Sequence, residues 1–139
     1  MRFLLDTNAV SEPFRPTPSA NFMHNMAKHR SAIAISVITW QELVSDAARL
    51  PRGRRRDALE RYHALVRASF PMLAYDEDAA TWAGREDARL ARRGITVSCE
   101  ELQIAAIATT SGSTLISADA AFRRFDGLTV LDWTSSAER

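Results

Sequence analysis

The stretch Phe3-Leu4-Leu5-Asp6-Thr7-Asn8 decides the fold, because a short apolar run ends directly in a carboxylate. A short, wholly apolar run of this kind is typical of a strand that is buried on both faces of a sheet. Open α/β sheets bind their ligands at the carboxyl ends of the strands. The stretch therefore predicts a buried first strand that delivers Asp6 to a ligand-binding edge.

Apolar runs and helical patterns alternate along the rest of the chain. Strands are expected at residues 2–5, 32–35, 72–74, 113–116 and 129–131. Helices are expected from about 19, at 37–50, 54–69, 76–94, from 98 onward, and as a short element at 120–125. The proline-containing segment between Asp6 and Ser19 is expected to be a loop. Alternating strands and helices predict an α/β fold with a mostly parallel sheet covered on both faces.

Length and composition indicate one globular domain, residues 1–139, in which 46% of the residues are hydrophobic and 25% are charged. No apolar run approaches the roughly 20 residues that span a bilayer, and the N-terminus does not have the pattern of a signal peptide. We therefore expect a cytoplasmic protein with no membrane contact. The single cysteine, Cys99, excludes internal disulfides and is expected to be a partly buried apolar residue.

The formal net charge of +1 hides a bias toward arginine, which accounts for all but one of the 18 basic residues. They concentrate in two segments, residues 49–67 and 85–93. Arginine forks match phosphate and carboxylate groups. The two segments are therefore either solvated helical surfaces or a binding face for a polyanion or an acidic partner.

Four acids occupy comparable places in this pattern. Asp6 and Asp119 follow apolar strands, while Glu42 and Glu101 lie in helices that follow strand or loop segments. Such junctions can meet at one edge of a parallel sheet, and gathered carboxylates repel one another unless a cation holds them. Mg²⁺ and Mn²⁺ prefer oxygen ligands and generate a nucleophile from bound water. The four acids therefore predict a metal-dependent enzyme that acts on phosphate esters.

Each acid also has a purely structural interpretation. Asp6 could shape the turn that follows the first strand, and Asp119 could cap the short helix after it. The segment from Ser98 to Glu101 fits a capping box. Glu42 could be a surface position of its helix, so the structural and the functional interpretations both remain open.

Other catalytic motifs are missing from the sequence. It contains neither a G-x-x-x-x-G-K-[ST] nor a G-x-G-x-x-G nucleotide-binding loop, and no G-x-S-x-G elbow. The three histidines show no zinc-like pairing with Cys or carboxylates. An aspartyl phosphatase would require Asp at the position of Asn8. These absences leave the acids as the main chemical feature.

Taken in order, four segments resemble PIN-domain proteins, and more narrowly VapC-type toxins of toxin–antitoxin pairs. They cover residues 4–13, 38–43, 101–108 and 115–119. The resemblance implies a three-layer α/β/α sandwich and an endoribonuclease toxin that uses a metal-activated water. It also implies a homodimer and a cognate antitoxin protein. Carried over by position, the Mg²⁺ or Mn²⁺ ligands and catalytic residues are Asp6, Glu42, Glu101 and Asp119, with Asn8 and Ser117 as supporting polar residues.

The sequence departs from that family pattern at two positions. Glu101 stands where the family usually has Asp, and Glu100 would take its place if the register differed by one. Ala121 stands where a further acid often occurs, which weakens a second metal position. The alternative function is therefore a catalytically weak PIN-like domain that acts by binding RNA or a protein.

Overall fold

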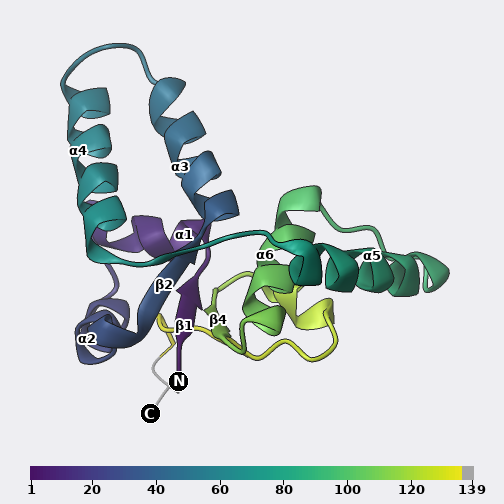
Figure 1. Ribbon diagram of the computed structural model, residues 1–139. Coiled ribbons are helices and arrows are strands. Elements are labelled where there is room, and N and C mark those ends of the chain that lie inside the picture. The colour runs from purple at the N-terminus through teal and green to yellow at the C-terminus, as the bar shows by residue number, and fades with distance from the viewer. Residues whose placement is uncertain (136–139) are drawn as a thin grey trace.

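The computed structural model describes residues 1–135 and contains a five-stranded sheet in the order β3-β2-β1-β4-β5. All neighbouring strands are parallel, which confirms the predicted sheet (Figure 1). The strands are β1 (Phe3–Leu5), β2 (Ile33–Ser36), β3 (Met72–Leu73), β4 (Thr114–Ile116) and β5 (Val130–Leu131).

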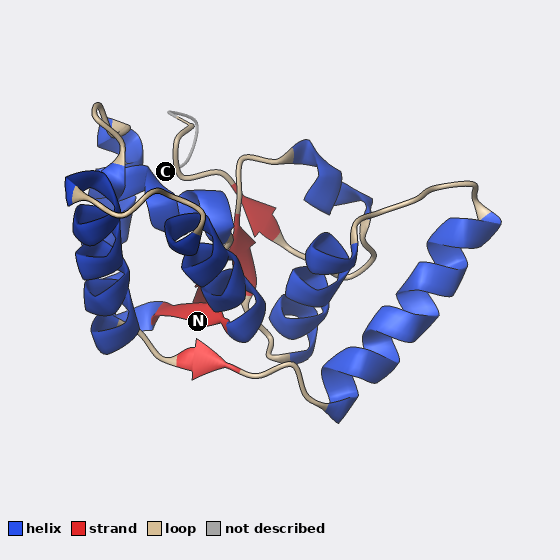
Figure 2. Ribbon diagram, turned by 90° about the horizontal axis from the view of Figure 1, so that it is seen from above, coloured by secondary structure: helices blue, strands red, loops and turns tan. Residues whose placement is uncertain are grey.

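Helices make up most of the remaining described chain and lie on both sides of the strands (Figure 2). The α-helices are α1 (Thr7–Ser11), α2 (Ala20–Lys28), α3 (Val37–Ala48), α4 (Arg54–Ser69), α5 (Glu77–Arg92) and α6 (Cys99–Thr110). Three short 3₁₀-helices are η1 (Glu12–Phe14), η2 (Arg30–Ala32) and η3 (Ala120–Arg124). In Figure 1, α3 and α4 run side by side and extend beyond the edge of the sheet.

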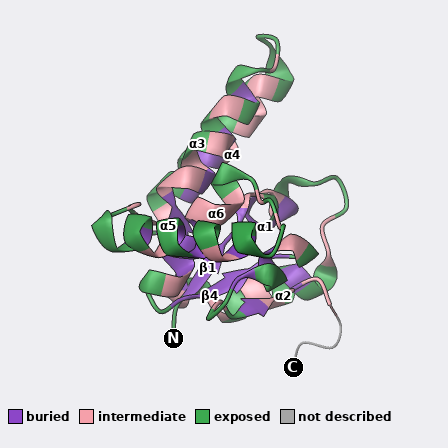
Figure 3. Ribbon diagram, turned by 90° about the vertical axis from the view of Figure 1, so that its right-hand side faces the viewer, coloured by how far each residue is buried: buried purple, intermediate pink, exposed green. Residues whose placement is uncertain are grey.

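The two faces of the sheet bury two separate cores, because successive side chains of a strand point to opposite faces. Leu4 of β1 packs in a core that includes residues of α5 and α6. Its neighbours Phe3 and Leu5 pack in a second core with residues of α1 to α4. The central strands β1, β2 and β4 are accordingly buried and the edge strands β3 and β5 partly buried, while the outer helix faces are exposed (Figure 3). This confirms the three-layer α/β/α sandwich.

Polar side chains begin the helices that follow the strands. Ser36 accepts a hydrogen bond from the backbone N–H of Thr39 at 3.0 Å, and Ser98 accepts one from the N–H of Glu101 at 3.1 Å. Each N-cap satisfies a backbone donor that has no partner within the helix. These caps place α3 directly after β2 and start α6 near the carboxyl edge of the sheet.

The segment after Asp6 differs from the sequence prediction, which described it as a loop. Residues 7–11 form helix α1, and residues 12–14 form η1 with Pro13 in its first turn. The helix forms because the Asp6 carboxylate accepts a hydrogen bond from the N–H of Ala9 at 2.8 Å. Proline is tolerated at a helix start, since its missing N–H would have no partner there.

Two smaller differences concern individual residues. Cys99 is exposed, because it is the first residue of α6 and lies outside the core; the expected partial burial was wrong. The short helix expected at 120–125 is the 3₁₀-helix η3. Across residues 1–135, no helix has the length and apolar character needed to cross a membrane.

Candidate active site

A cavity of ≈ 400 Å³ lies at the carboxyl ends of β1 and β4. Its lining includes all four acids that the sequence singles out: Asp6, Glu42, Glu101 and Asp119. These side chains come from segments that are up to 113 positions apart (119 − 6) in the sequence. Two further acids, Asp46 and Glu100, line the same cavity. Folding therefore gathers six carboxylates around one opening.

Asp6 is the most deeply buried of the acids, with 4% of its surface exposed. Its N–H donates to the carbonyl oxygen of Ile116 at 3.1 Å, which ties it to strand β4. Its Oδ1 caps α1 through the N–H of Ala9. The sequence suggests that Asp6 could shape a turn after the first strand; in the structure it instead caps α1, and it also lines the cavity. The cap uses Oδ1, so Oδ2 is free of that bond.

The pKa of the Asp6 carboxyl is raised above its ordinary value, chiefly because burial disfavours the charged form. Hydrogen bonds from Ser117 and Ala9 act in the opposite direction. The negative charges of Asp119 and Glu42 raise the pKa further. Asp6 is therefore held among like charges, and a cation in the cavity would relieve both the burial and the repulsion.

The Glu42 carboxylate is held by a hydrogen bond from the segment that follows Asp6. The hydroxyl of Thr7 donates a short hydrogen bond to Oε1 of Glu42, so α1 and α3 meet at the cavity. Asp46 lies one turn farther along α3, on the same face as Glu42. Thr7 and Asp46 are not predicted as site residues from the sequence. The four-residue spacing from Glu42 could have identified Asp46, whereas nothing local connects Thr7 with a residue 35 positions away.

Glu101 is held at the start of α6. Ser98 caps its N–H, as the capping-box interpretation requires. Its Oε2, however, is buried and has no hydrogen-bond partner among the described residues. The guanidinium Nη2 of Arg124 lies 3.9 Å away, beyond hydrogen-bond distance. A buried carboxylate oxygen without a donor is costly, so Oε2 of Glu101 is a candidate for binding a ligand.

Asp119 caps η3, since its Oδ1 accepts from the N–H of Ala121 at 2.9 Å. Ser117 lies behind it and accepts from the N–H of Asp119 at 3.0 Å. Asn8 lines this cavity and a neighbouring one of ≈ 730 Å³, which Ser117 also lines. The two predicted supporting residues thus lie beside the acids, and Ser117 contacts both aspartates.

The donor set fits a hard divalent cation, because it consists of carboxylate oxygens with neutral hydroxyl and amide oxygens beside them. The buried Oε2 of Glu101 supports the same assignment. Within residues 1–135, however, no three His, Cys, Asp or Glu side chains are already arranged as the ligands of one ion. A bound cation would therefore have to draw these side chains together.

Comparison with known proteins agrees with this fold. Residues 3–128 match the PIN domain family. The plasmid stability protein StbB of Pseudomonas syringae pv. tomato is 31% identical over 133 residues, covering 93% of this chain and 96% of that protein. The tRNA(fMet)-specific endonuclease VapC of Shigella flexneri is 29% identical, covering 96% and 99%.

A solved structure supports the same relationship. The DNA-bound VapBC of Salmonella typhimurium contains a chain that matches with a TM-score of 0.79 and 29% identity, covering 96% of this chain and 98% of that one. The match with the PIN family spans β1 to η3 and thus all four predicted site acids. The chain belongs to the PIN-domain family, and its relatives include VapC proteins of toxin–antitoxin pairs.

Proposed function

We propose that the protein is a metal-dependent endoribonuclease and the toxin of a toxin–antitoxin pair, formed as one PIN-like domain. One observation carries the proposal: acids from four separate segments line one cavity, and the most buried of them has a raised pKa. Structural carboxylates are normally paired with basic groups. The similarity to a VapC named as a tRNA endonuclease supports RNA as the substrate.

The ligands of Mg²⁺ or Mn²⁺ would be Asp6, Glu42, Glu101 and Asp119. When bound, the ion would lower the pKa of a water molecule and polarise the scissile phosphodiester. Asp6 anchors the site, because both strand β1 and helix α1 fix its backbone. Asp119 and Glu101 line the same cavity, where either carboxylate could accept a proton from the attacking water. Ser117 orients Asp6 and Asp119. Asn8 lines the same cavity and would offer its amide to the RNA.

The proposal includes the partners that similar proteins have. The Salmonella structure is a VapBC complex bound to DNA. We infer that this chain likewise binds a cognate antitoxin protein, forms a homodimer and acts in the cytoplasm. The arginine-rich helices α4 and α5 supply exposed basic surface for contact with the antitoxin or with RNA.

The test is incubation of purified, antitoxin-free protein with total RNA and with transfer RNA, in Mn²⁺, in Mg²⁺ and in EDTA. The proposal expects discrete cleavage that requires metal and is lost in Asp6→Asn. Metal-independent cleavage that persists in the variant would contradict it.

A catalytically weak, RNA-binding or protein-binding domain is the second candidate. The carboxylates are not preassembled around a single point, and Ala121 supplies no further acid, which favours this alternative. Under it, growth inhibition by the expressed protein would persist in Asp6→Asn. Loss of growth inhibition together with loss of cleavage would exclude it.

A further inference from the structure

We propose that Arg124 is an RNA phosphate-binding residue of the active site, and that without substrate it partly neutralises Glu101. This inference rests on the proposed nuclease function and names a residue that contacts its substrate. It is carried by the geometry of the Arg124 guanidinium, by the structure that fixes its backbone, and by the buried carboxylate oxygen beside it.

Two of its three nitrogens hold the guanidinium beside Glu101, one of the acids that line the cavity. Nε donates to the carbonyl oxygen of Ala121 at 3.1 Å, and Nη1 donates to that of Thr96 at 3.4 Å. The third nitrogen, Nη2, lies 3.9 Å from Oε2 of Glu101. These contacts fix the plane of the group while Nη2 makes no hydrogen bond with the described residues. The side chain keeps 37% of its surface exposed, so a ligand can reach it.

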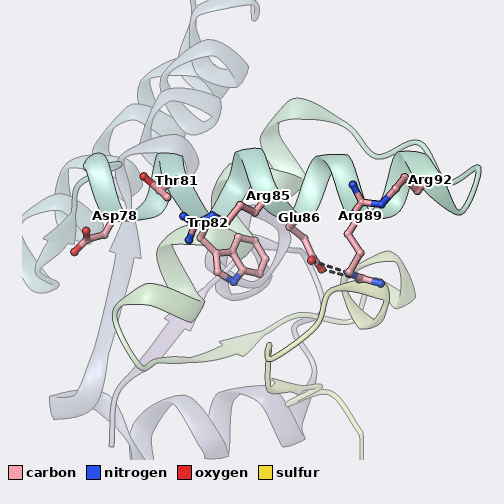
Figure 4. Close-up of a pocket in the computed structure, with 7 residues that line it drawn as sticks. All are labelled: Asp78, Thr81, Trp82, Arg85, Glu86, Arg89 and Arg92. Atoms are coloured by element: carbon pink, nitrogen blue, oxygen red, sulfur yellow. Dashed lines mark hydrogen bonds and ion pairs between the residues drawn. The ribbon is translucent and has the colours of Figure 1, made fainter.

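The backbone around Arg124 is hydrogen-bonded to side chains of helix α5. Arg89 donates to the carbonyl oxygen of Arg124 at 3.0 Å, and Glu86 accepts from the N–H of Asp126 at 2.8 Å. Glu86 and Arg89 form a two-bond ion pair with each other, drawn in Figure 4. Glu86 is 6% exposed. Because buried Glu86 and partly exposed Arg89 both bond to the backbone on either side of Arg124, the position of Arg124 is constrained.

The contrast between two arginine–glutamate contacts shows why Arg124 is available to a ligand. The Arg89 contact with Glu86 is 2.7 Å, within the range of a charge-assisted hydrogen bond. The Arg124 contact with Glu101 is 3.9 Å and involves an oxygen that has no hydrogen bond. Arg124 therefore supplies positive charge to Glu101 without using the Nη2 donors. Guanidinium donors in this arrangement match a phosphate oxygen.

Divalent cation and RNA would act on this contact together. A cation bound by Glu101 would repel the guanidinium, while a phosphate at the cavity would attract both. Arg124 is thus expected to oppose metal binding slightly in the free protein and to stabilise the bound RNA phosphate during cleavage. An arginine with only a structural role would not stabilise the bound RNA phosphate.

The experiment compares Arg124→Gln with Arg123→Gln, a matched control. Arg123 is the preceding residue of η3, is exposed, and its side chain makes no hydrogen bond or ion pair with the described residues. Both variants remove one positive charge. Mn²⁺ affinity is measured by titration without RNA, cleavage by steady-state kinetics, and folding by the thermal midpoint.

Arg124→Gln is expected to bind Mn²⁺ about 3-fold more tightly than the wild-type protein, because a nearby like charge is removed. Its kcat/KM for RNA should fall about 100-fold, as when a charge-stabilising donor is deleted. Arg123→Gln should change both quantities by less than about 2-fold, as for an exposed, screened charge. Arg124→Lys should keep wild-type Mn²⁺ affinity and lose part of the kcat/KM, because it retains charge without the fork.

Weaker Mn²⁺ binding in Arg124→Gln, or equal effects of the two glutamine variants, would overturn the assignment. If Arg124→Gln also loses thermal stability, the Lys variant decides: because lysine keeps the charge that attracts phosphate, a folded Arg124→Lys that cleaves no better than Arg124→Gln would overturn the phosphate contact. Failure of the wild-type protein to cleave RNA would contradict the nuclease proposal instead. In that case, binding of an uncleavable 2′-O-methyl RNA in Mn²⁺ tests Arg124 separately, and equal affinity of Arg124→Gln and Arg123→Gln would overturn its role.

Discussion

Asp6 and Glu86 are both buried carboxylates, but their surroundings shift their pKa values in opposite directions. Glu86 forms two hydrogen bonds with Arg89 and accepts a third from the N–H of Asp126. Its pKa is lowered, chiefly by the hydrogen bonds from Arg89. Asp6 has no basic partner among the described residues, and its pKa is raised by burial and by neighbouring acids. The charge of Glu86 is stabilised by a basic partner within the fold, whereas that of Asp6 receives only neutral hydrogen bonds and, under the proposed function, is stabilised by a bound metal ion.

The comparison separates acids that hold the fold together from acids that serve a site. A paired buried acid stabilises the native state only while its partner is present. An unpaired buried acid destabilises the native state. Such costly groups are typical of functional sites. Mutation of Asp6 should therefore lower RNA cleavage and leave stability unchanged or higher. Mutation of Glu86 should mainly lower stability.

The largest effect is expected from Asp6→Asn. Asparagine can still accept the hydrogen bond from Ala9, but it provides no charge for a metal ion. RNA cleavage should fall by about 1000-fold or more, equivalent to about 4 kcal/mol of transition-state stabilisation. The thermal midpoint in EDTA should be equal to or above that of the wild-type protein. A variant that retains cleavage would place the metal site elsewhere.

A second test asks which glutamate at the start of α6 belongs to the site. Both Glu100 and Glu101 line the cavity, but it is Oε2 of Glu101 that is buried without a partner. Glu101→Gln should lower kcat/KM by about 100-fold, as for loss of one charged group in a catalytic site. Glu100→Gln is the matched control and should change it by less than about 3-fold, as for an exposed charge. A larger effect of Glu100→Gln than of Glu101→Gln would mean that Glu100, and not Glu101, is the site acid of α6.

Glu86→Gln should lower the stability of the protein and leave RNA cleavage largely unchanged. It removes the charge that Arg89 pairs with and weakens three hydrogen bonds. We expect the free energy of unfolding to fall by about 2 kcal/mol, at the lower end for buried pairs because Arg89 is partly exposed. Chemical denaturation measures this loss. A variant as stable as the wild-type protein would mean that Glu86 is not the structural acid described above.

The pH dependence of stability in EDTA should differ in sign between the two acids. The folded pKa of Glu86 lies below its ordinary 4.5, so its contribution is present above pH 4.5 and is lost as the pH falls through the folded pKa. The folded pKa of Asp6 lies above its ordinary 3.8, so its protonated form favours folding below pH 3.8, and this benefit is lost as the pH rises through the folded pKa.

Two variants measure these contributions separately. Relative to the wild-type protein, Asp6→Asn should be more stable at neutral pH and lose that advantage as the pH falls toward 3.8. Glu86→Gln should be less stable at neutral pH and approach the wild-type protein below pH 4.5. If the stability of the wild-type protein and of both variants changed with pH in the same way, neither carboxyl would have the pKa shift described above.

Most strands and helices could be predicted from the sequence because local patterns determine them. The apolar run of β1, the caps Ser36 and Ser98, and the turn at Gly94 with its positive φ of 71° are all visible in the chain. Helix α1 was missed because the prolines after it favour a loop, while the Asp6 cap that starts it was interpreted only as a turn. Its five residues show no apolar periodicity.

The candidate site could be predicted less completely, because its electrostatics depend on contacts between distant segments. The sequence indicates which acids follow strands, but not that Thr7 bonds Glu42 or that Arg124 lies beside Glu101. It also cannot distinguish Asp6 from Glu86, since the presence or absence of a basic partner is a property of the fold. Whether the four acids bind metal stays a prediction.

The most direct test is a Mn²⁺ titration of the RNA-free protein followed by electron paramagnetic resonance, with Asp6→Asn and Glu86→Gln in parallel. If the unpaired acids form a metal site, the wild-type protein and Glu86→Gln bind Mn²⁺ at a specific site, and Asp6→Asn does not. Equal Mn²⁺ binding by all three proteins, or none by the folded wild-type protein, would contradict the assignment of the acidic cavity as a metal site.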